Sequence, residues 1–194
     1  VGINFKPPLF RSPSPNFAEM FFWEAKRQGR KVVYWKRTKP DILLIISKTS
    51  HQDLLDYYKK QGIKVVLRLD GVGVKDPSEP KKDNLNYLTA TKSDFIIYQS
   101  HFCQRIWERL FSLKKPSQII YNGADEQTFS REGKRENFGF KKLIVTAARW
   151  REWKNLKQVI DVFLNLDEPN LGLAVVGEGA TVPKHPKIIA TGRL

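Results

Sequence analysis

Short apolar runs recur along the chain, and polar turns or segments of helical periodicity separate them. The runs that predict strands are residues 3–5, 31–35, 41–47, 65–67, 95–98, 118–121, 143–148, 173–176 and 188–189. Several of them, such as 42–46, are apolar without alternation, which is typical of strands in a parallel sheet covered on both faces. The exchange of strand and helix therefore predicts an α/β protein of parallel βαβ units with right-handed crossovers.

The segments between these runs have the spacing of amphipathic helices. Helices are predicted over residues 17–28, 51–60 and 84–91, from residue 101 onward, and over 155–166. Asn16, Ser50 and Ser100 stand where N-caps are expected, because their side-chain oxygens can accept from free N–H groups of the first turn. In the helix after Ser100, the side chains predicted to face the core are Phe102, Ile106, Leu110 and Phe111.

The first predicted helix carries Phe17, Met20, Phe21 and Glu24 on one face. Its carboxyl-terminal end is basic, which suits the helix dipole. We interpret it as a core helix, in preference to an amphipathic helix that lies on an anionic membrane.

Composition narrows the class of protein. The chain has 194 residues, 41% of them hydrophobic, which allows one large domain or two small ones. No run approaches the ~20 apolar residues of a membrane span, and the first residues read as a strand, not as a secretory signal. Cys103 is alone, which excludes an internal disulfide and a metal site built on cysteines, and His51, His101 and His185 lack ligand-like spacing. We expect a cytoplasmic protein that needs no metal.

The net charge of +14 indicates what class of partner the protein binds. Basic residues are in excess in both halves of the chain and do not form a tail. Such a field attracts nucleic acid, anionic lipid headgroups or phosphorylated substrates. The charge therefore predicts an anionic partner without choosing among these three.

One basic segment lies where ligands of α/β proteins bind. Residues 149–155 follow the strand 143–148, which is predicted to be buried, and precede a predicted helix. Ligands of open α/β sheets bind at the carboxyl ends of strands, and a helix N-terminus favours anions. Arg149 and Lys154 in this segment predict a diphosphate site; the alternative is a solvated basic turn without a ligand.

The pattern also divides the chain. Residues 1–126 form a predicted Rossmann-like lobe, and the polar residues 127–140 are the expected linker. The alternation of strand and helix then restarts over residues 141–194. With three predicted strands and one clear helix, this second lobe is about half of a doubly wound domain.

Four motifs occur in order over the second half. They are DFIIYQS at 94–100, IIYNGAD at 119–125 with Phe129, AARWREWKN around Arg149 and Lys154, and LAVVGEG at 173–179. Together they resemble the retaining glycosyltransferases of family 4, which have the GT-B fold of two Rossmann-like lobes. Residues 191–193 match the end of the family's next strand, whereas the chain before residue 94 matches only as a generic acceptor lobe.

The resemblance implies a nucleotide-sugar donor held against the second lobe, without a required metal. Arg149 and Lys154 then correspond to the pair that holds the donor diphosphate. The positions implied for the nucleotide are Gly177, Glu178, Gly179, Gly192 and Arg193. Glycine would let the backbone approach the nucleotide without a Cβ clash; the alternative is an ordinary strand-to-helix turn.

The end of the predicted strand 65–67 supplies candidates for the acceptor side. Asp70 is the tentative catalytic residue, at a position where the family often has histidine; the alternative is that Asp70 caps a turn at Gly71. The further cleft and acceptor candidates are Arg68, Gly71, Ser100, Asn122 and Gly123.

One departure separates the chain from a complete member of that family. The pair of glutamates that binds sugar and ribose in the family has no counterpart before residue 194. Trp150 and Trp153 are available to stack on a base or sugar, although packing is the commoner role of such side chains.

The leading hypothesis is a glycosyltransferase, or part of one, that moves a sugar from a nucleotide-sugar to an acceptor with retention. A phosphorylated, lipid-linked or polysaccharide acceptor at a membrane surface suits the basic balance. The alternative is a non-catalytic basic module that binds nucleic acid through Lys59–Lys60, Lys81–Lys82 and Lys114–Lys115. A Rossmann-like protein of other chemistry is weakened because no G-x-G-x-x-G follows the first strand.

Overall fold

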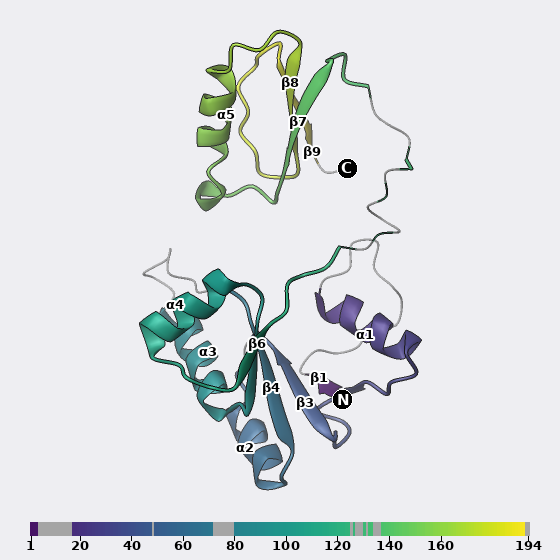
Figure 1. Ribbon diagram of the computed structural model, residues 1–194, viewed down its shortest axis with the longest axis vertical. Helices are drawn as coiled ribbons and strands as arrows, with labels where there is room; N and C mark the ends of the chain where they lie inside the picture. Colours follow the sequence, from purple (N-terminus) through teal and green to yellow (C-terminus); the bar gives the residue numbers. More distant parts are fainter. Residues whose placement is uncertain are drawn as a thin grey trace. The chain divides into compact units, whose positions relative to one another are not determined.

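The protein divides into two compact units, Val1–Asp125 and Glu126–Leu194. The computed structural model describes residues 1–3, 17–47, 49–71, 80–124, 126, 130, 132–133 and 137–192, with backbone alone for 80–84 (Figure 1). We call the two parts the amino-terminal unit and the carboxyl-terminal unit.

A parallel sheet forms the centre of the amino-terminal unit. Its strands are β1 (Gly2–Ile3), β2 (Val33–Tyr34), β3 (Ile42–Ile46), β4 (Lys64–Leu69), β5 (Phe95–Tyr98) and β6 (Ser117–Ile119). They lie in the order β2-β1-β3-β4-β5-β6, and every pairing is parallel. The predicted parallel α/β sheet is thus confirmed. Of the predicted strand 3–5, residues 4 and 5 lie outside the described part.

Four helices of the described residues surround this sheet: α1 (Phe17–Arg27), α2 (Gln52–Lys60), α3 (Pro80–Lys92) and α4 (His101–Phe111). The chain moves along the sheet in one direction from β3 to β6 and in the other from β1 to β2. Right-handed crossovers therefore place α2, α3 and α4 on one face and α1 on the other (Figure 1).

The helix boundaries test the predicted caps. Ser100 is the N-cap of α4, and its Oγ accepts from Cys103 N at 3.1 Å, as predicted. Ser50 is not the cap of α2: the helix begins one residue later, with His51 in the cap position, and Thr49 Oγ1 accepts from His51 N at 3.1 Å. The Asn16 cap lies outside the described residues.

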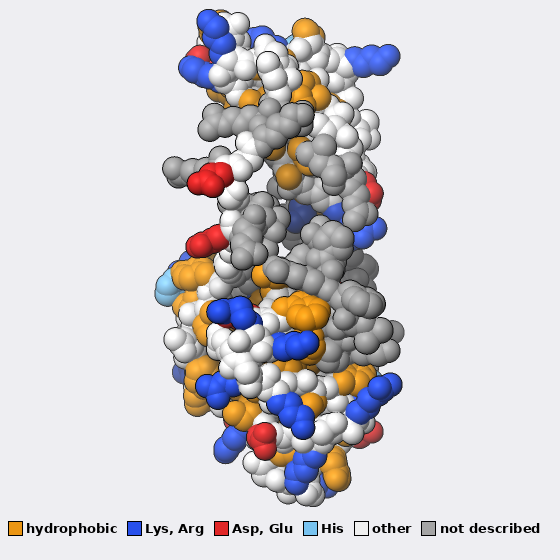
Figure 2. Space-filling view, turned by 90° about the vertical axis from the view of Figure 1, so that its right-hand side faces the viewer, with side chains coloured by type: hydrophobic (Ala, Val, Ile, Leu, Met, Phe, Trp, Pro, Cys, Tyr) orange, Lys and Arg blue, Asp and Glu red, His pale blue; other side chains and the backbone are white. Residues whose placement is uncertain are grey.

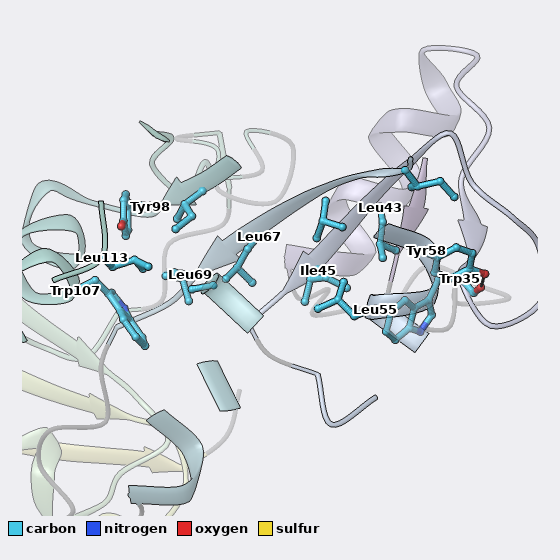
Figure 3. Packing of buried hydrophobic residues seen from close by; sticks show 14 of the residues in the cluster. Trp35, Leu43, Ile45, Leu55, Tyr58, Leu67, Leu69, Tyr98, Trp107 and Leu113 are labelled. Atoms are coloured by element: carbon cyan, nitrogen blue, oxygen red, sulfur yellow. Dashed lines mark hydrogen bonds between the residues drawn. The ribbon is translucent and has the colours of Figure 1, made fainter. Parts of the chain in front are cut away.

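The core of the amino-terminal unit contains side chains from the central strands and from the helices that cover them. Its largest fully buried members are Trp35, Trp107 and Tyr98. Figure 3 shows these aromatic rings packed with the aliphatic side chains of β3 and β4. Tyr58 on α2 donates its hydroxyl hydrogen to the carbonyl oxygen of Trp35, so the buried phenol is satisfied.

The predicted core face of α4 is wrong for Phe102 and Leu110, whereas Phe111 packs against the core as predicted. Phe102 is 64% exposed and Leu110 51%, whereas Cys103 and Trp107 are buried. Trp107 stacks on Phe111, with ring centroids 4.6 Å apart. The helix is turned so that its largest ring enters the core, and this leaves Phe102 and Leu110 at the surface.

The interpretation of α1 as a core helix is also wrong. Among its side chains only Ala18 is buried, and Phe17 is 37% exposed. The predicted common face of Phe17, Met20, Phe21 and Glu24 exists, but it lines a pocket. No helix of the described residues is long and apolar enough to cross a membrane.

The carboxyl-terminal unit has a smaller parallel sheet in its described part. Its elements are β7 (Lys142–Ala147), the 3-10 helix η1 (Glu152–Lys154), α5 (Leu156–Leu164), β8 (Leu171–Val176) and β9 (Ile188–Gly192). The strand order is β7-β8-β9. Leu156, Ile160 and Phe163 on α5 pack in a second core with Leu173 and Trp150.

The strand around residues 143–148 is not buried as predicted. Ile144 is 39% exposed and Val145 59%. Strand β7 is at one edge of the described sheet, and α5 is the described helix that packs on this sheet, on one face (Figure 1). The apolar side chains of β7 on the other face therefore have less cover than an apolar run predicts.

Candidate functional site

The loops that follow β7 and β8 meet the end of β9 at one edge of the carboxyl-terminal unit. Because the strands are parallel, their carboxyl ends lie side by side. Trp150 N donates to Glu178 O at 2.8 Å, and Gly177 N donates to Gly192 O at 2.7 Å. The structure thus brings Arg149, which follows β7, into the same edge as the loop 177–179 and Gly192. Arg193 lies outside the described residues.

Two glycines allow these loops to approach so closely. Gly177 has φ +114° and Gly179 φ +80°, conformations that L side chains rarely adopt. A Cβ on Gly177 would lie 1.9 Å from Ala148 O, and one on Gly179 would lie 2.7 Å from Trp150 O. Contact with the protein's own backbone therefore explains both glycines. Their role toward a nucleotide stays a prediction.

The two tryptophans of this edge differ in environment. Trp150 is buried, and its Nε1–H donates to Val176 O at 2.9 Å, so its ring belongs to the core. Trp153 is 52% exposed, and the guanidinium carbon of Arg151 lies 5.1 Å from its ring centroid. Of the two, Trp153 is the ring that a ligand can reach.

Arg149 and Lys154 both have exposed side chains. No ion pair joins either of them to a carboxylate within the described part of the chain. Asn155 precedes α5 with φ 55°, and its side chain makes no capping hydrogen bond. The first N–H groups of α5 are therefore not capped by Asn155. Cations and a helix N-terminus together suit an anion.

The predicted residues of the amino-terminal unit gather around Arg68. The guanidinium leaves the end of β4, and Arg68 is only 3% exposed. Its Nη1 donates to Asp70 Oδ1, and its Nη2 donates to Asn122 Oδ1. The guanidinium carbon also lies 3.8 Å from the ring centroid of Phe17 on α1. The charge of Arg68 is thus balanced by one carboxylate and shielded by an aromatic ring.

The backbone of Asp70 is held by α4. Trp107 Nε1 donates to Asp70 O at 3.2 Å, and the Cys103 thiol donates to the same oxygen with Sγ 3.1 Å away. The side chain of Asp70 remains 46% exposed. A fixed backbone, a partner cation and an accessible carboxylate can orient a hydroxyl group or accept its proton.

The other predicted residues of this unit have different surroundings. Ser100 uses its Oγ to cap α4. Gly71 and Gly123 have open space where a Cβ would lie. The predicted cleft set is therefore a network of Arg68, Asp70 and Asn122, with the remaining three residues in the adjoining loops.

The interpretation of the sequence missed three contributors to this network. Gln99 Oε1 lies 3.5 Å from Arg68 Nη2, Phe17 stacks on the guanidinium, and Trp107 holds the backbone of Asp70. Gln99 was visible as the polar residue after β5, where ligand-side residues are expected. The contacts of Phe17 and Trp107 join distant segments and have no local signal.

Cys103 provides a test of this packing. Burial raises its pKa to about 11, and a backbone hydrogen bond from Gln99 only partly offsets this. The thiolate is the reactive form, so we expect the folded protein to resist Ellman's reagent at neutral pH and to react at once in urea. Because the pKa of the Cys103 thiol is raised in the folded state, this thiol contributes to the stability of the fold while it is neutral. The contribution is fully present below about pH 8.5, the ordinary pKa of a thiol, and is lost as the pH rises toward 11. Rapid stoichiometric labelling of the folded protein at pH 7 would contradict the packing.

No group of three or more His, Cys, Asp or Glu side chains suited to a metal ion occurs among the described residues. Carboxylates are nevertheless present where the loops after β7 and β8 meet: Glu152 lies between Arg149 and Lys154 in the sequence, and Glu178 lies in the loop after β8.

Comparison with known proteins supports the fold. No protein-family model matches the sequence, and no curated protein matches it. Among solved structures, the crystal structure of a GtfA/B complex is similar, with a TM-score of 0.51 and 16% sequence identity. The match covers 91% of this chain and 37% of the other, so the protein spans well under half of its neighbour's length. At this identity the likeness shows the fold: the protein is GT-B-like, with two Rossmann-like α/β units.

Proposed function

We propose that the protein acts as a glycosyltransferase, or as part of one, that transfers a sugar from a nucleotide-sugar to a hydroxyl group of an acceptor. The observation that carries this proposal is the meeting of the loops after β7 and β8 with the end of β9 in the carboxyl-terminal unit, where Arg149, Lys154 and a helix N-terminus belong to the loop after β7. The GT-B-like fold and the motifs of the family 4 enzymes support it. Retention of configuration, the sugar and the base are finer parts of the same proposal.

In this mechanism the two cations act on the leaving group. As the glycosyl bond breaks, negative charge builds on the departing nucleoside diphosphate. Arg149 and Lys154 stabilise that charge most strongly at the transition state. Side chains carry this load, so the proposal needs no metal. The free N–H groups at the start of α5 add a favourable dipole.

The amino-terminal unit supplies the acceptor side. Asp70 is the candidate to orient the acceptor hydroxyl or accept its proton, and Arg68 positions Asp70. Lipid-linked, phosphorylated or polysaccharide acceptors remain compatible with the basic chain, as do a cytoplasmic location and peripheral contact with a membrane.

A thermal-shift screen against nucleoside diphosphates tests the donor site. We expect one of uridine, guanosine or adenosine diphosphate to raise the melting temperature, because a ligand that binds only the folded state stabilises it by mass action. At a concentration of about 100 times Kd the gain is about 2.7 kcal/mol. Arg149→Ala and Lys154→Ala should each abolish most of it.

Lys142→Ala is the matched control. Lys142 is the first residue of β7, at the amino ends of the parallel strands and away from the proposed site, and it pairs with Glu168 at 2.6 Å. The variant Lys142→Ala removes one positive charge, as the other two variants do, but outside the proposed site. Its thermal shift with the diphosphate should therefore equal that of the unmutated protein. If Arg149→Ala and Lys154→Ala show the same thermal shift as Lys142→Ala, the assignment of Arg149 and Lys154 is refuted.

The alternative function, a module that binds nucleic acid, loses support from the contacts of the paired lysines. Lys59 Nζ pairs with Asp94 at 3.0 Å, and Lys115 Nζ donates to the carbonyls of Thr91 and Ser93 at 2.8 and 3.0 Å. Figure 2 shows Lys and Arg side chains scattered over the visible face and not gathered into one patch. Steeply salt-dependent DNA binding without any diphosphate response would favour this alternative.

A further inference from the structure

A pocket of about 630 Å³ lies in the amino-terminal unit, beside α1. Its described walls are one face of that helix, residues 122–124 after β6, and parts of Val1 and Arg30. Small-molecule sites commonly measure about 300–1,000 Å³. The pocket therefore has the size of a ligand site, and α1 forms one of its walls instead of packing fully into the core.

The wall formed by α1 is chiefly apolar. Phe17, Met20, Phe21 and Ala25 line it, and the rings of Phe17 and Phe21 stack with centroids 6.4 Å apart. A methionine thioether adapts to apolar groups of variable shape. This wall suits an alkyl chain or an aromatic ring better than a purely polar molecule.

Glu24, one of the charged residues that line the pocket, is already paired. Glu24 accepts hydrogen bonds from Arg27 Nε at 2.7 Å and Nη2 at 2.6 Å, and from Gln28 Nε2 at 2.8 Å. The hydrogen bonds from Arg27 and then Gln28 lower the pKa of Glu24 to about 2, so the carboxylate stays ionised and matched by a cation. The pocket thus combines the apolar residues of α1 with the charged residues Glu24 and Arg30.

Arg68 connects the pocket to Asp70. Two lining residues touch its guanidinium: the Phe17 ring, whose centroid is 3.8 Å away, and Asn122, which accepts from Nη2. Nη1 of the same guanidinium donates to Asp70. Arg68 and Asp70 do not line the pocket themselves; Arg68 contacts the lining residues Phe17 and Asn122, and Asp70 is the next residue in this chain of contacts.

We propose that this pocket binds the apolar part of an amphiphilic acceptor, an alkyl- or aryl-linked molecule whose hydroxyl-bearing head reaches Asp70. The description of the ligand as an acceptor rests on the proposed function, whereas its binding does not. A free sugar has no apolar group to contact the apolar wall of the pocket, so it binds more weakly.

The test is a calorimetric titration with butyl, hexyl and octyl glucoside, each below its critical micelle concentration, and with glucose. Affinity should rise with chain length, by roughly three- to fourfold for each added methylene group until the pocket is full. Glucose should show no measurable heat. An affinity independent of chain length, or equal binding of glucose, would overturn the proposal.

Two variants locate the binding. Ala25→Trp fills the pocket without removing a packed side chain, and Met20→Gln makes its wall polar at similar volume. Each should weaken octyl glucoside by about tenfold or more, the equivalent of two buried methylene groups. If one variant fails to fold by circular dichroism, the other decides.

Phe102→Ser is the control, because Phe102 is 64% exposed on α4 and is not among the residues that line the pocket. It should leave octyl glucoside binding unchanged. Loss in Phe102→Ser together with full binding in both pocket variants would place the amphiphile on α4 and refute the assignment. The titration contains no nucleotide, so a failed diphosphate screen and a failed glucoside titration are separate outcomes.

Discussion

Gly177→Ala is expected to destabilise the carboxyl-terminal unit by about 3 kcal/mol or more, because backbone strain and a steric clash add at one position. The new Cβ would lie 1.9 Å from Ala148 O at φ +114°. The clash is with backbone, so no side-chain rotation relieves it. Strands β7 and β8 have to separate where Ala148 N donates to Val176 O at 3.2 Å. Urea unfolding followed by amide NMR signals of each unit measures the effect.

Gly139→Ala provides the matched control for this effect. Gly139 also has positive φ, +79°, but nothing lies within 4 Å of the position of a Cβ. It should cost about 1–2 kcal/mol, the ordinary penalty for a left-handed alanine. The signals of the amino-terminal unit should keep their midpoint in both variants. Equal effects of the two substitutions would show that the loops at 148–150 and 177–179 are not in close contact.

Trp107→Ala is expected to destabilise the amino-terminal unit by about 3–5 kcal/mol, the usual cost of deleting a large buried ring. Trp107 has no exposed surface, stacks on Phe111 and donates to Asp70 O at 3.2 Å. The variant removes packing and releases the backbone at the candidate catalytic residue. Equilibrium urea unfolding of the purified protein measures the change.

Two further variants separate the causes. Trp107→Phe keeps a ring and loses the hydrogen bond to Asp70, so about 1 kcal/mol of the effect is expected from that bond. Phe102→Ala removes a ring that is 64% exposed and should change stability by less than about 0.5 kcal/mol. A larger loss from Phe102→Ala than from Trp107→Ala would restore the orientation of α4 that the sequence predicts.

Strands were predictable because parallel strands are apolar throughout. Residues 95–98 were expected as a strand and form β5 with the same bounds. The parallel order of the sheet follows from the same alternation of strands with helices. The exposure of Val145 was not predictable, because an apolar run does not reveal how many elements cover it.

The orientation of α4 shows why helix faces are harder to predict. Helix α4 has two adjacent apolar stripes. One contains Phe102 and Leu110, and the other contains Cys103 and Trp107. Periodicity alone does not choose between two apolar stripes. The indole of Trp107 decides the orientation, since it reaches a carbonyl at the end of β4, which lies far away in the sequence.

The sequence predicted which residues are candidates for the two sites, but not which side chains contact one another there. Strand ends in α/β sheets carry ligand-side residues, and this rule, together with the family resemblance, selected Asp70 after β4 and Arg149 after β7; their roles stay predictions. The stacking of Phe17 on Arg68 joins residues 51 positions apart, and Asn122 reaches the same guanidinium from the loop after β6, across 54 positions. Such contacts depend on the assembled sheet, so the pocket beside α1 had no signature in the sequence.

Titration of the labelled protein with the selected nucleoside diphosphate, followed by amide chemical shifts, tests the central claim most directly. The account predicts saturable shifts confined to residues 148–150, 154–156, 177–179 and 192, all at the carboxyl edge of the smaller sheet. The amides of Lys142, Asn170 and Lys187, at the opposite edge, should stay in place. Shifts at that opposite edge, or no shifts at a saturating concentration of uridine, guanosine and adenosine diphosphate, would contradict a donor site in this unit.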